Sequence, residues 1–170
     1  MIRITPNHAF FFKEWPSNFR KTKFTWTSFC ETHEFLCTEQ AFMWAKAKFF
    51  GDETTAGDIL AHGSDPMYCK ACGRKVRNYD DSEWSKVRYD YMLLTNLERF
   101  RQDKELRAKL LDSKFEGKTF AEASPFDRIW GIGLAQDLAE EFIDNELNWP
   151  GKNLMGKVIT EVRNRIKEEK

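Results

Sequence analysis

The segment 82–101 constrains the fold most, because its apolar residues recur at helical spacing along its length. Trp84, Val87, Tyr91 and Leu94 are three or four residues apart, so a helix places them on one face. Ser82 stands where an N-cap is expected. A helix with one apolar stripe must pack that stripe against other elements. The segment therefore predicts a long helix within a packed, helix-rich domain.

Further helices and a few strands are predicted from the rest of the chain. The run 38–50 has no Gly or Pro and is followed by Gly51, a typical residue just after a helix end. Strands are expected where aromatic residues alternate with Thr at 24–29, and also at 34–37 and 115–123. More helices are predicted at 54–61, 66–76, 103–111 and in a final segment with Leu154, Val158, Val162 and Ile166 on one stripe. The fold class predicted is α+β, mainly helical, with a small β-sheet.

The length and composition indicate one soluble domain covering residues 1–170. A chain of 170 residues can bury one substantial core, and it contains no internal repeat or Pro/Gly-rich linker. Hydrophobic residues make up 41% and charged residues 32%, which is typical of a folded protein and not of a disordered one. Fifteen Phe and six Trp supply an excess of aromatic rings, which build cores and also the walls of sites for flat heterocycles.

The charge balance and the absence of long apolar runs restrict the partners. Lys and Arg together number 27, as do Asp and Glu, so the net charge is zero. This excludes a broad nucleic-acid-coating role but permits a small basic pocket. No run approaches the roughly 20 apolar residues that span a bilayer, and no secretory signal is recognisable. We therefore expect a cytoplasmic protein with no membrane partner.

Four cysteines are expected to be free thiols in that compartment. Cys69 and Cys72 form a C-x-x-C pair, but no second pair follows and the nearest histidine is His62. Cys30 and Cys37 lie at no recognisable zinc-finger spacing. The sequence therefore predicts no metal site.

Glu39 and Lys46 are the first candidates for chemistry. Seven residues on a helix advance by about 700°, so both side chains point nearly the same way, two turns apart. Phe42, Met43 and Trp44 make the helix between them mostly apolar. One interpretation is a solvated face without special function. The other is a carboxylate and a desolvated amine held in one cleft.

The segment 122–133 supplies a second group of candidates. Glu122 precedes a Pro-led turn, and Asp127 and Trp130 lie three residues apart, so one turn can present both to the same pocket. Gly131 and Gly133 suggest backbone that passes close to something flat or phosphorylated. An ordinary tight loop with a core Trp is the alternative.

Asn153 comes directly before the predicted final helix. A helix N-terminus with exposed amides and a nearby lysine can bind an anion. Asn153 can equally be a plain N-cap, which is the better interpretation from the sequence alone.

Several motifs taken in order resemble the NADAR (YbiA-like) N-glycosidase family. Trp15-Pro-Ser-Asn18-Phe19 is followed by Thr38-Glu39-Gln40-Ala-Phe-Met-Trp-Ala-Lys46, and later by Gly73-Arg74-Lys-Val76 with Trp84 and Arg88. Glu122-Ala-Ser-Pro-x-Asp127-x-x-Trp130-Gly131 and Asn153-Leu-Met-Gly156 complete the pattern. The resemblance covers roughly residues 9–165. It implies a single compact α+β domain with a small β-sheet.

The resemblance also implies an N-glycosidase that needs no cofactor or metal. Its substrate would be ADP-ribosylated guanine in nucleic acid or a nucleotide-type small molecule, namely a phosphorylated early intermediate of riboflavin biosynthesis. Glu39 is then expected in acid/base work and Lys46 as a nucleophile, with direct attack by water as the alternative. Asp127 is expected as the third catalytic residue, acting on the ribose hydroxyls. Expected substrate contacts come from Asn18, Phe19, Arg74, Trp84, Glu122, Trp130, Gly131 and Asn153.

The competing hypothesis is a non-catalytic ADP-ribose or nucleotide-binding module. Such a module would keep the aromatic residues and Arg74 but could dispense with Glu39 and Lys46. The presence of both favours catalysis. The oligomeric state stays open.

Overall fold

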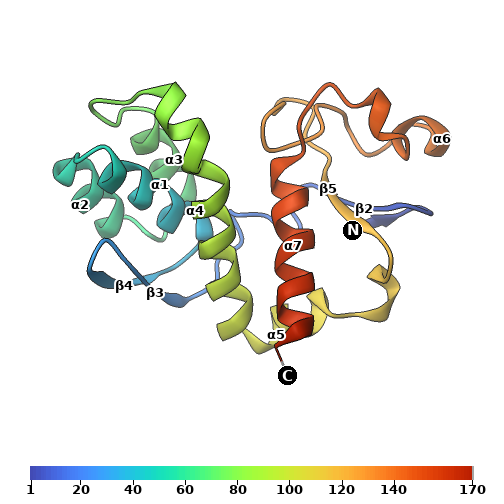
Figure 1. Ribbon diagram of the computed structural model, residues 1–170, viewed down its shortest axis with the longest axis horizontal. Helices are drawn as coiled ribbons and strands as arrows, with labels where there is room; N and C mark the ends of the chain where they lie inside the picture. Colours follow the sequence, from blue (N-terminus) through green and yellow to red (C-terminus); the bar gives the residue numbers. More distant parts are fainter. Residues whose placement is uncertain (170) are drawn as a thin grey trace. The chain divides into compact units, whose positions relative to one another are not determined.

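The computed structural model describes residues 1–169 and divides the chain into two compact units. One unit is continuous and comprises residues 18–104, whereas the other combines residues 1–17 with 105–170, of which the last is not described. The chain is a mixed α+β protein, as the sequence predicts (Figure 1). That residues 1–170 form a single domain stays a prediction.

The continuous unit is mainly helical. A hairpin of β3 (Phe24–Ser28) and β4 (Glu31–Phe35) precedes α1 (Thr38–Phe49), α2 (Glu53–Ala61), α3 (Pro66–Gly73) and α4 (Asp81–Gln102). The helix α1 packs against α2, α3 and α4. Aromatic rings fill the space between the hairpin and α1, since Trp44 contacts both Trp26 and Phe35. The core of this unit therefore surrounds α1.

The discontinuous unit contains a three-stranded sheet of β1 (Arg3–Ile4), β2 (His8–Phe11) and β5 (Thr119–Glu122). β1 is antiparallel to β2, and β2 is parallel to β5. The long helix α7 (Leu154–Glu168) packs along β5 (Figure 1). Short helices complete the unit: α5 (Lys104–Leu110), which begins at the unit boundary, and η1 (Ser113–Phe115), α6 (Glu140–Ile143) and η2 (Glu146–Asn148).

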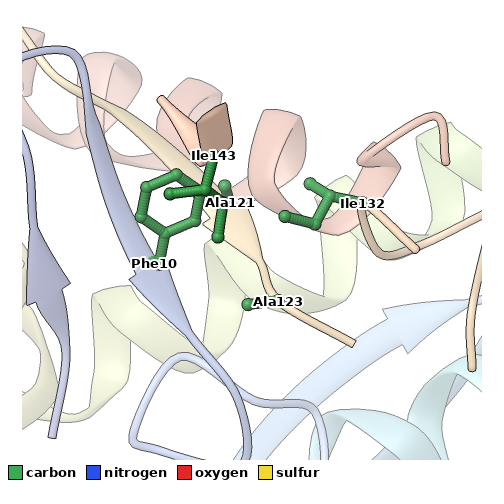
Figure 2. Close-up of a cluster of buried hydrophobic side chains, with 5 residues drawn as sticks. All are labelled: Phe10, Ala121, Ala123, Ile132 and Ile143. Carbon is green, nitrogen blue, oxygen red and sulfur yellow. The ribbon is translucent and has the colours of Figure 1, made fainter. Parts of the chain in front are cut away.

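A small apolar cluster anchors the loop 123–133 to this sheet. Phe10 of β2 lies beside Ala121 of β5, its partner in the register (Figure 2). Ala123, Ile132 and Ile143 complete the cluster, and all five residues are at most 1% exposed. The loop that carries Asp127 and Trp130 is therefore fixed at both of its ends by buried side chains.

Several predicted boundaries differ from the structure. Asp80, and not Ser82, caps α4, because its carboxylate accepts hydrogen bonds from the amides of Ser82 and Glu83. The strand expected at 34–37 lies at Glu31–Phe35, because Cys37 caps α1 instead. The strand expected at 115–123 is limited to Thr119–Glu122. Gly51 follows the end of α1 with a φ of +72°, as a residue just after a helix often does.

Candidate active site

Glu39 lies in the first turn of α1 and is only 7% exposed. Asn18 holds this turn in place, because its carbonyl oxygen accepts a hydrogen bond from the amide of Glu39 and its side-chain Nδ2 donates to Oε2 of Glu39 at 3.4 Å. The side-chain oxygen of Asn18 in turn accepts from the hydroxyl of Thr38 at 2.9 Å. The position near a helix N-terminus also favours the negative charge of the carboxylate. Glu39 is thus a buried carboxylate that polar neighbours orient.

Lys46 lies two turns further along α1 and is half-buried. Its Nζ donates to the carbonyl oxygen of Gly73 at 2.8 Å and lies 4.3 Å from the ring centroid of Tyr79. Burial lowers the pKa of the Lys46 amine, and the charges of Glu39 and Asp81 partly oppose that shift. A desolvated amine loses its proton at lower pH than a free lysine does. Burial is thus the feature of Lys46 that favours the neutral amine, whereas its contacts with the Gly73 carbonyl and the Tyr79 ring hold its side chain in position.

Gly73 and Tyr79 are the neighbours of Lys46 that sequence reasoning missed as part of this site. A β-carbon on Gly73 would lie 1.9 Å from Sδ of Met43, so the absence of a side chain lets the end of α3 approach α1. The hydroxyl of Tyr79 donates to Asp81 at 2.7 Å, and burial together with that bond raises the pKa of Tyr79 to about 12. Gly73 belongs to the motif Gly73-Arg74-Lys-Val76, but nothing in the sequence connects Tyr79 with Lys46.

The other candidates of this unit differ in accessibility. Arg74 follows Gly73 directly, at the C-cap of α3, and is exposed. Phe19 is half-buried, with the amine of Lys70 5.5 Å from its ring centroid. Trp84 is 4% exposed and its ring stacks on that of Tyr91 at 5.8 Å. Its burial favours a role in the core over the predicted stacking on substrate.

The discontinuous unit holds the remaining candidates, on the loop after β5 and on the segment before α7. Oδ1 of Asp127 accepts hydrogen bonds from the amides of Ile129 and Trp130 at 2.9 and 2.8 Å. Asp127 therefore shapes the turn that carries the half-buried Trp130. Glu122, at the end of β5, accepts the amide of Ile132 at its carbonyl oxygen.

Gly131 has a structural reason to be glycine. A β-carbon at this position would lie 2.9 Å from the carbonyl oxygen of Asp127 and 3.0 Å from that of Glu122. The backbone at Gly131 thus passes close to other parts of the same loop. Its close approach to a substrate, as the sequence suggested, stays a prediction.

Asn153 is used by the fold in a way that the sequence did not predict. Its backbone is left-handed with φ of 53°, and it precedes α7 without capping the helix through its side chain. Instead, Nδ2 donates to the carbonyl of Phe120 and Oδ1 accepts the amide of Glu122, both at 3.0 Å. The side chain therefore pairs with the edge of β5, and it is only 1% exposed.

The expected anion site at the start of α7 is also occupied by the protein itself. The amides of Asn153, Leu154 and Met155 donate to the carbonyls of Gly131, Ile129 and Trp130 at about 3 Å each. Amides that already donate to the loop are not available to a bound anion. This part of the site supports the loop 127–131 and not a phosphate.

The cysteines have the properties of structural thiols. Burial raises the pKa of Cys37 to about 11 and that of Cys69 to about 12, so both stay protonated at neutral pH. All four are free, and residues 1–169 contain no cluster of three or more His, Cys, Asp or Glu side chains suited to a metal ion. Over the same residues, no helix is long and apolar enough to cross a membrane.

Three comparisons relate this chain to known proteins. N-glycosidase R617 of Acanthamoeba polyphaga mimivirus is 37% identical over 153 residues, which cover 89% of this chain and 85% of the relative. Protein irg-1 of Caenorhabditis elegans is 38% identical over 135 residues, or 78% of this chain and 61% of the relative. The NMR structure of the E. coli protein YbiA matches with a TM-score of 0.71 and 23% identity, covering 99% of this chain and 89% of that one. This last match shows a shared fold.

The family model described as the NADAR domain matches residues 3–167. That span covers all of the continuous unit, nearly all of the discontinuous one and every candidate residue above. The chain belongs to the NADAR family.

Proposed function

We propose that this chain hydrolyses the N-glycosidic bond that joins ADP-ribose to guanine in nucleic acid. Family membership and 37% identity to an N-glycosidase identify it as a hydrolase acting on N-glycosyl compounds. The observation that carries the mechanism is the desolvated amine of Lys46 on the same buried helix as the carboxylate of Glu39.

Breaking an N-glycosidic bond requires help at both ends of the bond. Positive charge develops on C1′ and the ring oxygen of the ribose, while the base leaves with the bonding electron pair. A nearby carboxylate stabilises the positive charge, and a proton donor stabilises the leaving base. Glu39 is suited to the first task, and to the second after it has taken up a proton.

Lys46 is the proposed nucleophile. Its neutral amine forms a bond to C1′ as the bond to the base breaks, and Glu39 transfers the proton lost by the amine to the leaving base. The ribose ring then opens: the nitrogen lone pair forms a C=N bond, and a proton moves from nitrogen to the ring oxygen. Water adds to the imine carbon, and the bond from that carbon to Lys46 breaks. The ring-opened ribose is released, and the free amine of Lys46 is regenerated.

Substrate contacts in the continuous unit follow from accessibility. Arg74 is exposed beside Gly73, whose carbonyl binds Lys46, so we assign it to the phosphates of ADP-ribose. Asn18 is only 8% exposed, so its assignment to a ribose hydroxyl is based not on accessibility but on its contact with the carboxylate of Glu39. Phe19 is half-buried and supplies a ring face.

The residues of the loop 122–131 are assigned to recognition. Trp130 is half-buried and is proposed to stack on a base. Asp127 uses Oδ1 for its turn, so its second oxygen is proposed to bind ribose hydroxyls. Glu122 is a further carboxylate candidate for the same task. Asn153 and Gly131 act through the loop that they hold.

The experiment that tests the proposal measures release of ADP-ribose from an oligonucleotide carrying ADP-ribosylated guanine. Release by the wild type and its loss in Glu39→Gln and Lys46→Ala is the expected result. If the wild type releases nothing, the assay is repeated with phosphorylated intermediates of riboflavin biosynthesis. Intact substrates in both assays would leave a nucleotide-binding module and would reject catalysis.

A second experiment separates the lysine nucleophile from direct attack by water. Lys46→Arg keeps the positive charge but removes the nucleophile. We expect at least a 100-fold loss of kcat, on the order of the loss of a catalytic group. Borohydride should trap the wild type on substrate, and Lys46→Arg should not be trapped. Activity of Lys46→Arg near the wild-type level would rule out the imine, leaving water as the nucleophile.

A further inference from the structure

The connection 74–80 between α3 and α4 determines what surrounds the amine of Lys46. Gly73, directly before this connection, accepts from Nζ at 2.8 Å, and the ring centroid of Tyr79, near its other end, lies 4.3 Å from Nζ. The connection belongs to neither helix, so its own hydrogen bonds must fix its course. The surroundings of the amine therefore depend on what holds this connection.

A buried carboxylate holds the connection in its middle. Asp52, the N-cap of α2, is 1% exposed, and its Oδ2 accepts the amide of Arg77 at 2.9 Å. Its Oδ1 accepts from the Arg77 guanidinium at 3.1 Å. Burial disfavours the charge of Asp52, but hydrogen bonds from Arg77 and Thr55 outweigh it and hold the pKa of Asp52 below its usual range. Asp52 is therefore charged at neutral and alkaline pH, and this anchor does not itself titrate there.

The chain turns sharply between the anchored Arg77 and Tyr79. Asn78 has a φ of +62°, in the left-handed region that asparagine adopts more readily than most residues. The ring of Tyr79 then packs edge-on against that of Phe50, with 5.5 Å between the centroids. Because Arg77 is fixed only two residues before Tyr79, the place of the Tyr79 ring depends on Asp52.

The ring of Tyr79 covers the Lys46 amine without adding a charge, because the pKa of Tyr79 is raised to about 12. A ring face attracts an ammonium group, but it also excludes the water that the charged form needs. Glu39 on α1 and Asp81 on α4 favour the charge on Lys46, whereas Arg88 on α4 acts on Tyr79. Burial outweighs the two carboxylates and lowers the pKa of Lys46. The cover is therefore expected to favour the neutral amine.

We propose that Asp52 is a positioning residue for the Lys46 nucleophile, because it holds the backbone at Arg77 so that the ring of Tyr79 keeps water from the amine. This inference rests on the proposed function and makes it more specific, since it names the contacts that keep the nucleophile in its neutral form. The helix α2, which carries no candidate residue, thereby takes part in the reaction through its N-cap.

Asp52→Asn separates this role from the capping of α2. The asparagine Oδ1 can still accept the amide of Thr55, but Nδ2 in the place of Oδ2 cannot accept the amide of Arg77. We expect kcat/KM at pH 7 to fall at least about tenfold, since a misplacement of roughly 1 Å can cost about 100-fold. The rising limb of its pH dependence should move to higher pH.

Thr55→Val is the matched control for Asp52→Asn. It removes the hydroxyl that donates to Oδ2 of Asp52 at 2.6 Å, but it leaves the contacts between Asp52 and Arg77 in place. The rising limb of Thr55→Val should therefore stay at the wild-type pH, even if the free energy of unfolding falls. A limb that does not move in folded Asp52→Asn, or that moves equally in Thr55→Val, would overturn the proposal.

Variants of Tyr79 test the same connection from its other end. Tyr79 is 44% exposed, so Tyr79→Ala should fold, and its limb should move to higher pH at least as far as that of Asp52→Asn. Tyr79→Phe keeps the ring, and its limb should stay close to that of the wild type. An equal shift in both Tyr79 variants, or a shift of Tyr79→Ala to lower pH, would contradict the role of the ring.

A measurement without substrate separates this inference from the proposed reaction. NMR of ¹³Cε-labelled lysine follows the titration of the Lys46 amine, and Lys46→Met identifies its signal. In Asp52→Asn and Tyr79→Ala, the pKa of Lys46 should move toward the ordinary value of 10.5, whereas Thr55→Val should leave it unchanged. If the wild type releases no ADP-ribose but these shifts occur, the proposed reaction fails while the positioning role stands. An unchanged titration in both variants rejects the role.

Discussion

The helix α1 and the loop 122–133 both carry candidate residues, but they use their polar atoms differently. On α1, other residues hold Glu39 and Lys46 in place: Asn18 donates to the carboxylate, and the carbonyl of Gly73 accepts from the amine. In the other unit, Asp127 of the loop and Asn153, which precedes α7, use polar side-chain atoms to hold backbone. This difference agrees with the proposal that the chemistry comes from α1, whereas the loop contributes recognition.

Burial leads to the same division. The amine of Lys46 is half-buried and its pKa is lowered, so its environment changes its reactivity more than it stabilises the fold. Asn153 at 1% exposure has no surface to offer a ligand, but it satisfies two backbone groups of β5. Substitutions in the two regions should therefore separate into losses of activity and losses of stability.

Glu39→Gln should give the largest effect on activity. The amide keeps the size of the side chain and can still accept from Asn18, but it cannot stabilise positive charge or transfer a proton. We expect kcat to fall about 1000-fold with little change in the free energy of unfolding. Rate assays and urea unfolding measure the two quantities. Glu53→Gln, an exposed residue at the start of α2, is the control. A less than tenfold loss of kcat in Glu39→Gln would contradict the assignment of the chemistry to α1.

Asn153→Ala should have the opposite effect to Glu39→Gln, namely a loss of stability with activity retained. The substitution leaves the carbonyl of Phe120 and the amide of Glu122 without their side-chain partner and forces alanine into a left-handed backbone. We expect the free energy of unfolding to fall by about 3 kcal/mol. Denaturant unfolding measures it, with exposed Asn164→Ala on α7 as the control. Activity per folded molecule should persist, and a 100-fold lower kcat at full stability would contradict the structural role.

The pH dependence of the rate should report on Lys46. The neutral amine is the nucleophile, so kcat/KM should rise up to about tenfold per pH unit until the lowered pKa is passed, and then level off. The charge of Asp81 raises this pKa, so Asp81→Asn should move the rising limb to lower pH. Glu83→Gln, another acidic residue in the first turn of α4, should not. An unshifted limb in Asp81→Asn would indicate that a group other than Lys46 titrates.

The lowered pKa of Lys46 also makes the free energy of unfolding depend on pH. Between the lowered folded pKa and the ordinary value of 10.5, an unfolded chain keeps the lysine proton that the folded chain has lost. Because of this group, the free energy of unfolding therefore increases as the pH rises through that window. Lys46→Met should remove this contribution, which thermal unfolding at several pH values can detect.

Asp127→Asn should have the smallest effect. The amide oxygen can still accept from the amides of Ile129 and Trp130, so the turn is retained while the charge is lost. We expect KM to rise about threefold to tenfold, because a hydrogen bond from a ribose hydroxyl to a charged carboxylate becomes a weaker one to a neutral amide, with kcat nearly unchanged. Asp137→Asn on the same loop region is the control. A 100-fold lower kcat would move Asp127 into the chemistry.

Local patterns predicted the helices better than they predicted the sheet. The spacing of Trp84, Val87 and Tyr91 predicted α4, and the run before Gly51 predicted α1, because helical hydrogen bonds are local. The parallel pairing of β2 with β5 joins segments that are far apart in the sequence. No local pattern carries that information, and the strand expected at 115–123 was consequently too long.

The candidate site was predictable only in part, for the same reason. Helical geometry places Glu39 and Lys46 on one face, and the structure contains that helix. Asn18, the partner of Glu39, was among the predicted residues. The partners of Lys46, Gly73 and Tyr79, are far from it in the sequence, so no local pattern connects them with it. Asn153 matched an N-cap by its position, but tertiary contacts with β5 decided what its side chain binds.

The parallel pairing of β2 with β5 also affects the order in which the protein can fold. The first strand of that pair is synthesised early, whereas its partner follows only after all of residues 18–104. The continuous unit has its own sheet and helices within that stretch, so it can form before β2 pairs with β5. Closing so long a loop carries an entropic cost that a folded insert would reduce. We therefore expect the helical unit to fold first, and the three-stranded sheet to form last.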